Sequence, residues 1–442
     1  MTTALQQIDH IFILMMENRS FDHMLGYLDA ANPKIMGIAN ATAAGYANRL
    51  PNGTPYPPET RIDPTVPEDP LHEREAVALQ MGPANQPAMT GFVQNYATVS
   101  AYDPEPVGQY YTANAVSTMD FLARNFRVCD RWFACLPAST QPNRLMAASG
   151  YTLRDLTQEG LLSNQDNMVY DWLIEHGVSW RVYSEGFPFF SLMQSVRRKM
   201  FSLRWGGCFR GFTSLKPEIQ RDPDFPQVTF IEPAYTDASH PNVGANDDHP
   251  TTSIAAGQEF LRLAYDAVTS NPERWRKSLL IIHYDEHGGF FDHVQPPAFE
   301  TPQNHGESYE PFKTLGVRVP GLIVSPFVTP STCFDGTLDH TSVLKLFAEK
   351  YSPGHPYSAD VDARTLVQSL SVALDLDTAR TDLPGVPDAP MHATRMAQRA
   401  PTPFPSPNAT AFLNAIAAMR RTNPETAAAR FPAWRDYFLR GR

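Results

Sequence analysis

Charged residues, cysteines and long hydrophobic runs are all scarce in this chain of 442 residues. Only 19% of the residues are charged, and 36 Lys and Arg face 47 Asp and Glu, which gives a formal net charge of -11. A protein that grips duplex nucleic acid must neutralise many phosphates, so this balance argues against a nucleic-acid partner. The four cysteines form no CxxC pair, so neither a disulfide scaffold nor a cysteine zinc site is indicated.

The N-terminus also lacks the positively charged segment that opens a secretory signal, since no Lys or Arg precedes Arg19. Its apolar run, Ile11–Met16, is far too short to span a bilayer. We therefore expect a cytoplasmic protein whose contact with a membrane is at most peripheral. A secreted or periplasmic location is the alternative if a leader has been removed, and the sequence gives no sign of the oligomeric state.

Short, nearly continuous apolar runs recur along the chain and are typical of strands buried on both faces of a parallel sheet. Helical stripes lie between them at Thr251–Ser270 and His340–Tyr351. This alternation predicts an α/β fold, a doubly wound, mostly parallel sheet with helices on both faces. The expected strands are Ile11–Met16, Val178–Tyr183, Val228–Ile231, Leu279–Tyr284 and Gly321–Phe327.

Proline is abundant, with 40 residues, and this favours long ordered loops. Pro51–Pro70 is expected to be a surface excursion without elements of its own, and Leu383–Pro407 a second proline-rich stretch. Helices are predicted after it at Ala409–Arg420 and Pro424–Leu439. We therefore divide the chain into a catalytic domain with loop-rich insertions, residues 1–380, and a connector with a helical tail, residues 381–442.

Polar residues follow two of the expected strands. Glu17 and Asn18 open the motif ENRSFDH, and Asp285 and Glu286 stand in YDEHGGFFDHV. Ligands of open α/β sheets bind outside the carboxyl ends of strands, and adjacent carboxylates there favour a bound cation. The alternatives are that Asn18 and Ser20 cap a helix while Glu17 is solvated, and that one carboxylate of the second pair faces water.

The stretch LPASTQPNRL presents Thr140 at an expected strand-to-helix turn, followed by Asn143 and Arg144. A hydroxyl needs a metal or a base to act as a nucleophile, and a nearby cation would make Thr140 a candidate. The alternative is that Ser139 or Thr140 caps a helix that starts near Pro142.

Histidines supply the candidate proton donors. His249 stands in ANDDHPTT, where Asp247 and Asp248 could instead be charges at the start of the following helix. His72 in DPLHE and His340 in LDHTS are weaker candidates, because lone histidines are more often structural.

These four blocks in this order, followed by GVRVPGLIVSPFV and LDHTSVLKLF, resemble the bacterial phosphoesterase family of non-haemolytic phospholipases C and AcpA-type acid phosphatases. The resemblance runs from about Ile8 to about Tyr351. It implies a fold similar to alkaline phosphatase and a single metal site. The cation ligands it implies are Glu17, Asn18, Asp285, Glu286 and the nucleophilic hydroxyl of Thr140.

The same resemblance places His72, His249 and Asp248 around the bound phosphoryl group. Family members typically read GPTNPNR where this chain reads ASTQPNR, and alignment on PNR favours Thr140 over Ser139 as the nucleophile. The chain also reads DEHGG where the family often has DENGG, which adds His287 to the edge of the site.

Oxygen ligands favour one hard divalent ion, Ca²⁺, Mg²⁺ or Mn²⁺. The hypothesis is a phosphoesterase that forms a phosphothreonine intermediate on Thr140 while His249 protonates the leaving group. We expect a phospholipid or a small phosphate ester as substrate, and a phospholipase C that releases diacylglycerol and a phosphorylated headgroup. An acid phosphatase for phosphomonoesters is the first alternative, and a non-catalytic, metal-stabilised binding protein of the same fold is the second.

Overall fold

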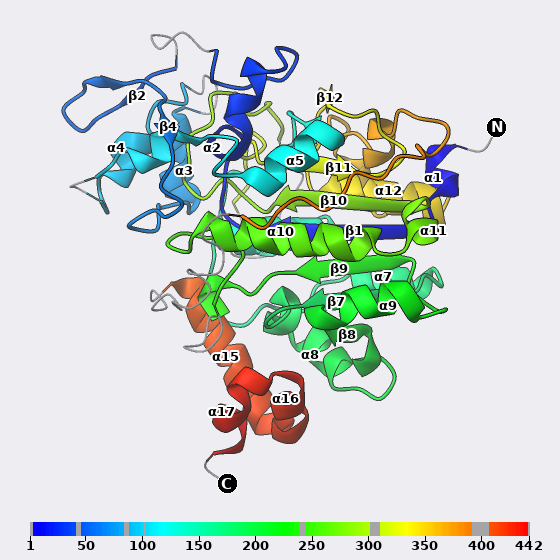
Figure 1. The fold of residues 1–442 in the computed structure, drawn as a ribbon. Helices are drawn as coiled ribbons and strands as arrows, with labels where there is room; N and C mark the ends of the chain where they lie inside the picture. The colour runs from blue at the N-terminus through cyan, green and yellow to red at the C-terminus, as the bar shows by residue number, and fades with distance from the viewer. Residues whose placement is uncertain are drawn as a thin grey trace.

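A twisted sheet of eight strands forms the centre of the protein (Figure 1). The computed structural model describes residues 3–40, 46–83, 88–100, 103–238, 244–300, 310–390 and 406–440. In spatial order the strands are β12 (Thr332–Phe334), β6 (Arg127–Cys129), β11 (Gly321–Val324), β10 (Ser278–Tyr284), β1 (His10–Met16), β9 (Val228–Glu232), β7 (Trp180–Ser184) and β8 (Phe209–Gly211).

Each of the five expected apolar runs overlaps a strand of this sheet, because buried strands in the middle of a sheet need apolar side chains on both faces. The strands run parallel, except that β11 is antiparallel to both β10 and β6. In the centre, β1 and β10 are parallel neighbours with Met16 opposite Tyr284. Glu17 and Asp285 therefore leave the sheet side by side at its carboxyl edge.

Helices cover both faces of the sheet, as Figure 1 shows for α10. On one face, α5 (Ser117–Asn125) packs beside α10 (Ile254–Thr269), and the Tyr284 hydroxyl of β10 reaches the Met119 sulfur of α5 at 3.6 Å. The other face carries α6 (Thr140–Ser149), α7 (Val169–Glu175) and α12 (Thr341–Tyr351). The predicted α/β class, a mostly parallel sheet between two helical layers, is confirmed.

Shorter elements decorate this core. The excursion at Pro51–Pro70 contains two-residue strands, so the expectation that it has no elements is wrong.

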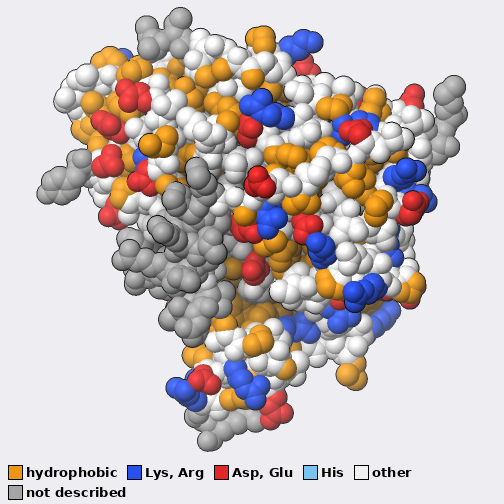
Figure 2. Space-filling view, in the orientation of Figure 1, with side chains coloured by type: hydrophobic (Ala, Val, Ile, Leu, Met, Phe, Trp, Pro, Cys, Tyr) orange, Lys and Arg blue, Asp and Glu red, His pale blue; other side chains and the backbone are white. Residues whose placement is uncertain are grey.

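None of the described helices is long and apolar enough to cross a bilayer. Acidic and basic side chains are interspersed over the face shown in Figure 2. The short elements are α1 (Ala4–Gln7), α2 (Phe21–Leu25), α3 (Arg74–Met81), α4 (Phe92–Tyr96), α8 (Gln194–Met200), α9 (Leu215–Arg221), α11 (Pro272–Trp275), α13 (Ala359–Asp362), β2 (Asn48–Arg49), β3 (Pro55–Tyr56), β4 (Thr60–Arg61) and β5 (Tyr110–Tyr111).

In the C-terminal tail, the predicted helix Ala409–Arg420 is α15 (Pro407–Thr422). The helix predicted at Pro424–Leu439 is wrong as one element, because it is interrupted near Pro432 and forms α16 (Pro424–Arg430) and α17 (Arg435–Leu439). Much of the proline-rich stretch before them, residues 391–405, lies outside the described residues. The Phe412 ring of α15 stacks on Tyr235, with ring centroids 5.7 Å apart, so the tail packs on the loop that follows β9. The division of the chain at residues 380 and 381 stays a prediction.

A buried guanidinium ties together the segments that follow the two central strands. Arg318, which precedes β11, has no exposed surface. It donates to Asp22 Oδ1 of α2 at 2.8 Å and to Asp292 Oδ1, beyond β10, at 3.1 Å. It also donates to the carbonyls of Met36 and Asp130, at 2.8 Å each. The loops that carry the polar strand ends are therefore held in one geometry.

We expect Arg318→Leu to lower the free energy of unfolding by about 3–5 kcal/mol, because it leaves buried Asp292 without its ion pair and Asp22 with only that to His293. Denaturant titration measures the change. The matched control is Arg124→Leu, whose side chain is 53% exposed and pairs with Asp120. It should cost less than about 1 kcal/mol. Equal losses for the two variants would contradict the role given to Arg318.

Candidate functional site

Two carboxylates meet where β1 and β10 end. Glu17 and Asp285 have no exposed surface, and Arg144 of α6 reaches both. Its Nη2 lies 3.0 Å from Glu17 Oε1, and its Nε donates to Asp285 Oδ2 at 3.0 Å. Glu286 is equally buried. The alternatives in which Glu17 or one residue of the Asp285 pair faces solvent are therefore wrong.

Burial destabilises the charged forms of Glu17 and Asp285, whereas His72 and His287 outweigh burial at Glu286 and lower its pKa. Burial raises the pKa of Glu17 well above its usual value; Arg144 opposes this rise, and Asp285 adds to it. Burial likewise raises the pKa of Asp285 to about 6 against the effect of Arg144. A buried group whose pKa moves in this direction favours its neutral form unless more positive charge is supplied.

Asn18 lies between the two strand ends. Its backbone is left-handed, with φ of 59°, and its N–H donates to Asp285 Oδ1 at 3.2 Å. Gly288 makes this approach possible, because a Cβ there would lie 2.2 Å from the Asn18 carbonyl oxygen. The amide of Asn18 faces Thr140, whose Oγ1 lies 3.5 Å from Asn18 Oδ1. The structure therefore brings the expected nucleophile to the predicted strand-end site.

The turn before α6 fixes this hydroxyl without using it as a cap. Ser139 occupies the cap position, but its hydroxyl donates to Glu73 Oε2 at 2.6 Å and caps nothing. The capping alternative is therefore wrong for Ser139. The Asn143 amide donates to the carbonyls of Ala138 at 2.7 Å and Ser139 at 3.1 Å. Asn143 thus positions the turn that presents Thr140.

Two histidines and an aspartate lie against the strand ends. Asp69, His72 and His249 each offer a ligand atom within 4.8 Å of the other two. His72 Nε2 is 3.3 Å from Asn18 Nδ2 and 3.9 Å from Glu286 Oε1. Sequence reasoning missed Asp69, and its only signal was a position three residues before His72.

Both histidines favour the protonated form. Burial alone would lower the pKa of His249, but Asp69 outweighs it, with help from Asp237 and Asp247, and the pKa rises to about 9. Burial would also lower the pKa of His72, but the negative charges of Glu286 and Asp69 raise it, and the pKa reaches about 9. The site therefore holds positively charged rings beside the carboxylates at neutral pH.

Asp248 is not brought to this histidine pair. Its backbone is left-handed, with φ of 71°, and its carboxylate accepts from the Tyr284 hydroxyl at 2.5 Å. It lies against Gly257 of α10, where a Cβ would come within 1.9 Å of Asp248 Oδ1. The neighbouring Asp247 is nearer the strand ends, since its carbonyl accepts from Glu17 N–H at 2.8 Å. A role for Asp248 at the phosphoryl group stays a prediction.

The two remaining candidates support their neighbours. His287 Nδ1 lies 3.4 Å from Glu286 Oε2, and its Nε2 lies 2.8 Å from Gln80 Oε1. His340 Nε2 lies 2.7 Å from the Asp285 carbonyl, and its Nδ1 accepts from the Trp132 indole at 3.2 Å. Burial lowers the pKa of His340 to about 4, so this ring is neutral and holds the backbone at the end of β10.

The strand ends offer oxygen donors of the kind that a hard cation takes. Among the described residues, both oxygens of Glu17, Oε1 of Glu286 and Oδ1 of Asp69 are buried and accept no hydrogen bond, although Glu17 Oε1 forms an ion pair with Arg144 Nη2 at 3.0 Å. Buried polar atoms without partners are rare, and carboxylate and amide oxygens are the usual ligands of Ca²⁺, Mg²⁺ and Mn²⁺. A second candidate group, Asp22, Asp292 and His293, has its carboxylates bound to Arg318 instead.

Comparison with known proteins defines the class. Residues 8–352 match the phosphoesterase family. The non-specific phospholipase C6 of Arabidopsis thaliana is 31% identical, over 88% of this chain and 76% of that protein. The non-hemolytic phospholipase C of Burkholderia pseudomallei is 26% identical, over 92% of this chain and 65% of that protein. A solved structure from Vibrio parahaemolyticus, in the alkaline phosphatase superfamily, aligns with a TM-score of 0.34 at 9% identity, covering 79% of this chain and 68% of that one.

The chain belongs to the phosphoesterase family, because the match covers more than half of its length. It is a phosphoric ester hydrolase. This agrees with the resemblance found in the sequence motifs.

Removing and restoring a cation should change the stability of the protein. After EDTA treatment, we expect Ca²⁺, Mg²⁺ or Mn²⁺ to raise the melting temperature, since a cation at about 100 times its Kd adds about 2.7 kcal/mol. Glu17→Gln should abolish most of this gain. The control, Asp9→Asn, changes a surface carboxylate paired with Lys277 and should keep the gain. A gain that persists in Glu17→Gln would place the cation elsewhere.

Proposed function

We propose that this phosphoesterase is a metal-dependent phospholipase C, which releases diacylglycerol and a phosphorylated headgroup. The observation that carries the proposal is the Thr140 hydroxyl at the start of α6, 3.5 Å from Asn18 Oδ1, at strand ends where buried oxygens of Glu17 and Glu286 accept no hydrogen bond. The relatives named as phospholipases C support a phosphodiester as the substrate.

Glu17, Asn18, Asp285 and Glu286 would hold one divalent cation, with Thr140 as a further ligand. When bound, the cation supplies positive charge that lowers the pKa of the Thr140 hydroxyl and neutralises the phosphoryl oxygens.

The chain's own residues carry the reaction in two displacements. Thr140 gives its proton to solvent water, and its Oγ1 forms a bond to phosphorus while the bond from phosphorus to the glycerol oxygen breaks; the leaving alkoxide takes a proton from His249. The neutral His249 then takes a proton from the water that attacks the phosphothreonine. The bond from phosphorus to Thr140 Oγ1 breaks, Thr140 regains its proton from solvent, and the phosphorylated headgroup leaves. His72, which lies beside Asn18 and Glu286, holds the phosphoryl oxygens through its positive charge.

Two chromogenic substrates test the reaction class. The enzyme should hydrolyse the diester p-nitrophenylphosphorylcholine with a higher kcat/KM than the monoester p-nitrophenyl phosphate. Thr140→Ala should lower kcat on the diester by roughly 10³-fold or more, because it removes the nucleophile.

The matched control is Ser139→Ala, which removes the neighbouring hydroxyl bound to Glu73 and should change kcat by less than about tenfold. The reverse ranking of the two variants would move the nucleophile to Ser139. A preference for the monoester would indicate an acid phosphatase instead.

The proton donor should give activity an alkaline limit. His249 must be protonated to act as the acid, and its pKa is about 9, so kcat/KM on a short-chain phosphatidylcholine should hold at neutral pH and fall as pH rises through about 9. His249→Asn should lower that rate by about 10²- to 10⁴-fold. The change should be smaller with p-nitrophenylphosphorylcholine, whose leaving group departs without a proton.

The exposed His355 provides the control, and His355→Asn should retain both rates and the same pH profile. An equal loss in His249→Asn on both substrates would assign His249 a role other than proton donation.

A further inference from the structure

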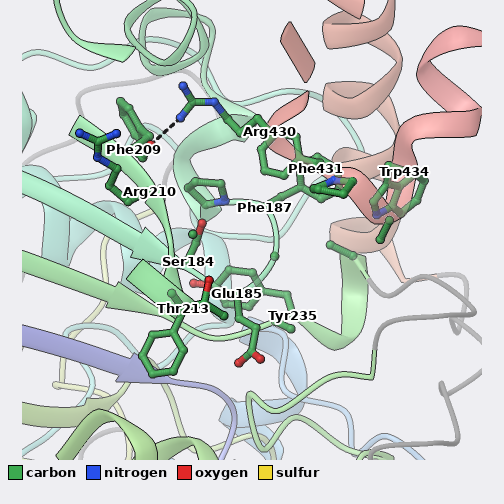
Figure 3. Close-up of a pocket in the computed structure, with 18 of the residues that line it drawn as sticks. Ser184, Glu185, Phe187, Phe209, Arg210, Thr213, Tyr235, Arg430, Phe431 and Trp434 are labelled. Carbon is green, nitrogen blue, oxygen red and sulfur yellow. Dashed lines mark hydrogen bonds between the residues drawn. The ribbon is translucent and has the colours of Figure 1, made fainter. Parts of the chain in front are cut away.

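A cavity of about 190 Å³ opens between the carboxyl ends of the outer strands and the C-terminal tail. Figure 3 shows rings from both sides around it: Phe187 and Tyr235 come from the loops after β7 and β9, while Phe431 and Trp434 come from the tail. The aromatic members of its wall are Phe187, Phe209, Phe212, Tyr235, Phe431 and Trp434.

Two of the three charged groups of the wall are bound within the protein, and the third, Arg210, has a 44% exposed side chain whose Nε lies 3.8 Å from Glu218 Oε1. Arg430 Nη1 donates to the Phe209 carbonyl at 2.8 Å, drawn as a dashed line in Figure 3, and its Nη2 donates to the Gly206 carbonyl at 3.0 Å. Glu185 Oε2 accepts from the Asn246 amide at 2.6 Å. Because the rest of the lining consists mostly of aromatic, alanine, proline and glycine residues, the cavity suits an apolar ligand better than a phosphate or a sugar.

The cavity adjoins the proposed catalytic site through two contacts. The Tyr235 ring lines the cavity, and its hydroxyl accepts from Arg144 Nη1 at 3.1 Å, the guanidinium that bridges Glu17 and Asp285. Asn246, which binds Glu185 at the wall, directly precedes Asp247, whose carbonyl accepts from Glu17 N–H at 2.8 Å. These contacts join the wall of the cavity to the residues that hold Glu17 and Asp285 in place.

We propose that the cavity binds the first part of an acyl chain on the diacylglycerol side of the substrate, an inference that rests on the proposed phospholipase C function. An apolar cavity of about 150 Å³ suffices for benzene, so 190 Å³ accommodates a short hydrocarbon segment. The rest of the chain stays in the lipid aggregate. The tail, through Phe431 and Trp434, is thereby part of the substrate-binding surface.

Two soluble choline esters separate this proposal from its competitors. Dihexanoylphosphatidylcholine, used as monomers, has acyl chains, whereas p-nitrophenylphosphorylcholine has the same headgroup and no chain. Trp434→Ala, at the half-buried rim, should lower kcat/KM about tenfold on the first and less than twofold on the second. Ala433→Trp, which adds an indole at the mouth, should have the same selective effect.

Leu413→Ala provides the matched control, because this α15 side chain is 57% exposed and is not part of the cavity wall. It should leave both rates unchanged. Equal losses on both esters in Trp434→Ala and Ala433→Trp would overturn the proposal, since a choline-binding cavity or a general loss of structure predicts that pattern. Unchanged rates in both variants would overturn it as well.

Binding of a neutral alkyl probe separates failure of the cavity from failure of the proposed function. Wild-type protein should bind 1-hexanol in ligand-observed NMR, and Ala433→Trp should weaken that binding at least tenfold. If wild-type protein hydrolyses neither ester but shows this binding pattern, the phospholipase C function fails and the apolar cavity stands. If 1-hexanol does not bind, the acyl-chain proposal fails whatever the activity.

Discussion

Negative charge buried at the ends of β1 and β10 is the constraint on which the rest of the site depends. Removing a carboxylate from water costs several kcal/mol even after relaxation, and Glu17, Asp285 and Glu286 are all fully buried. Arg144 offsets part of this cost by contacting two of them. The part of the burial cost that Arg144 does not offset raises the pKa values of Glu17 and Asp285. The site is thus arranged for additional positive charge, which a divalent cation would supply.

The surrounding structure exists to hold these groups at short range. Arg318 fixes the segments beyond both strands, and Asn143 shapes the turn that presents Thr140. His340 stays neutral and holds the Asp285 carbonyl. None of these three side chains needs to touch a substrate. Their contribution is geometric, because a hydroxyl, an amide and two carboxylates perform phosphoryl transfer only when their positions are fixed in advance.

The C-terminal tail packs against residues that adjoin the candidate site. Asn408 of α15 donates to Asp237 at 2.8 Å, and its Oδ1 accepts from the Gln141 amide, next to Thr140, at 3.2 Å. Farther along, Phe412 stacks on Tyr235, which itself contacts Arg144. These contacts explain how helices without any catalytic motif can form one wall of a cavity beside the site.

Local sequence pattern was enough to predict the central strands and the helices between them, because strands buried on both faces are continuous apolar runs. It also predicted the polar residues at the strand ends, because these residues come directly after the apolar runs in the sequence. Local pattern did not predict three features: the antiparallel course of β11, the position of Asp69 beside His72 and His249, and the orientation of Asp248 toward Tyr284. Only the tertiary structure decided these features. Each depends on contacts between residues far apart in the chain, as when Arg144 meets Asp285 across 141 positions, and no local periodicity encodes such a meeting.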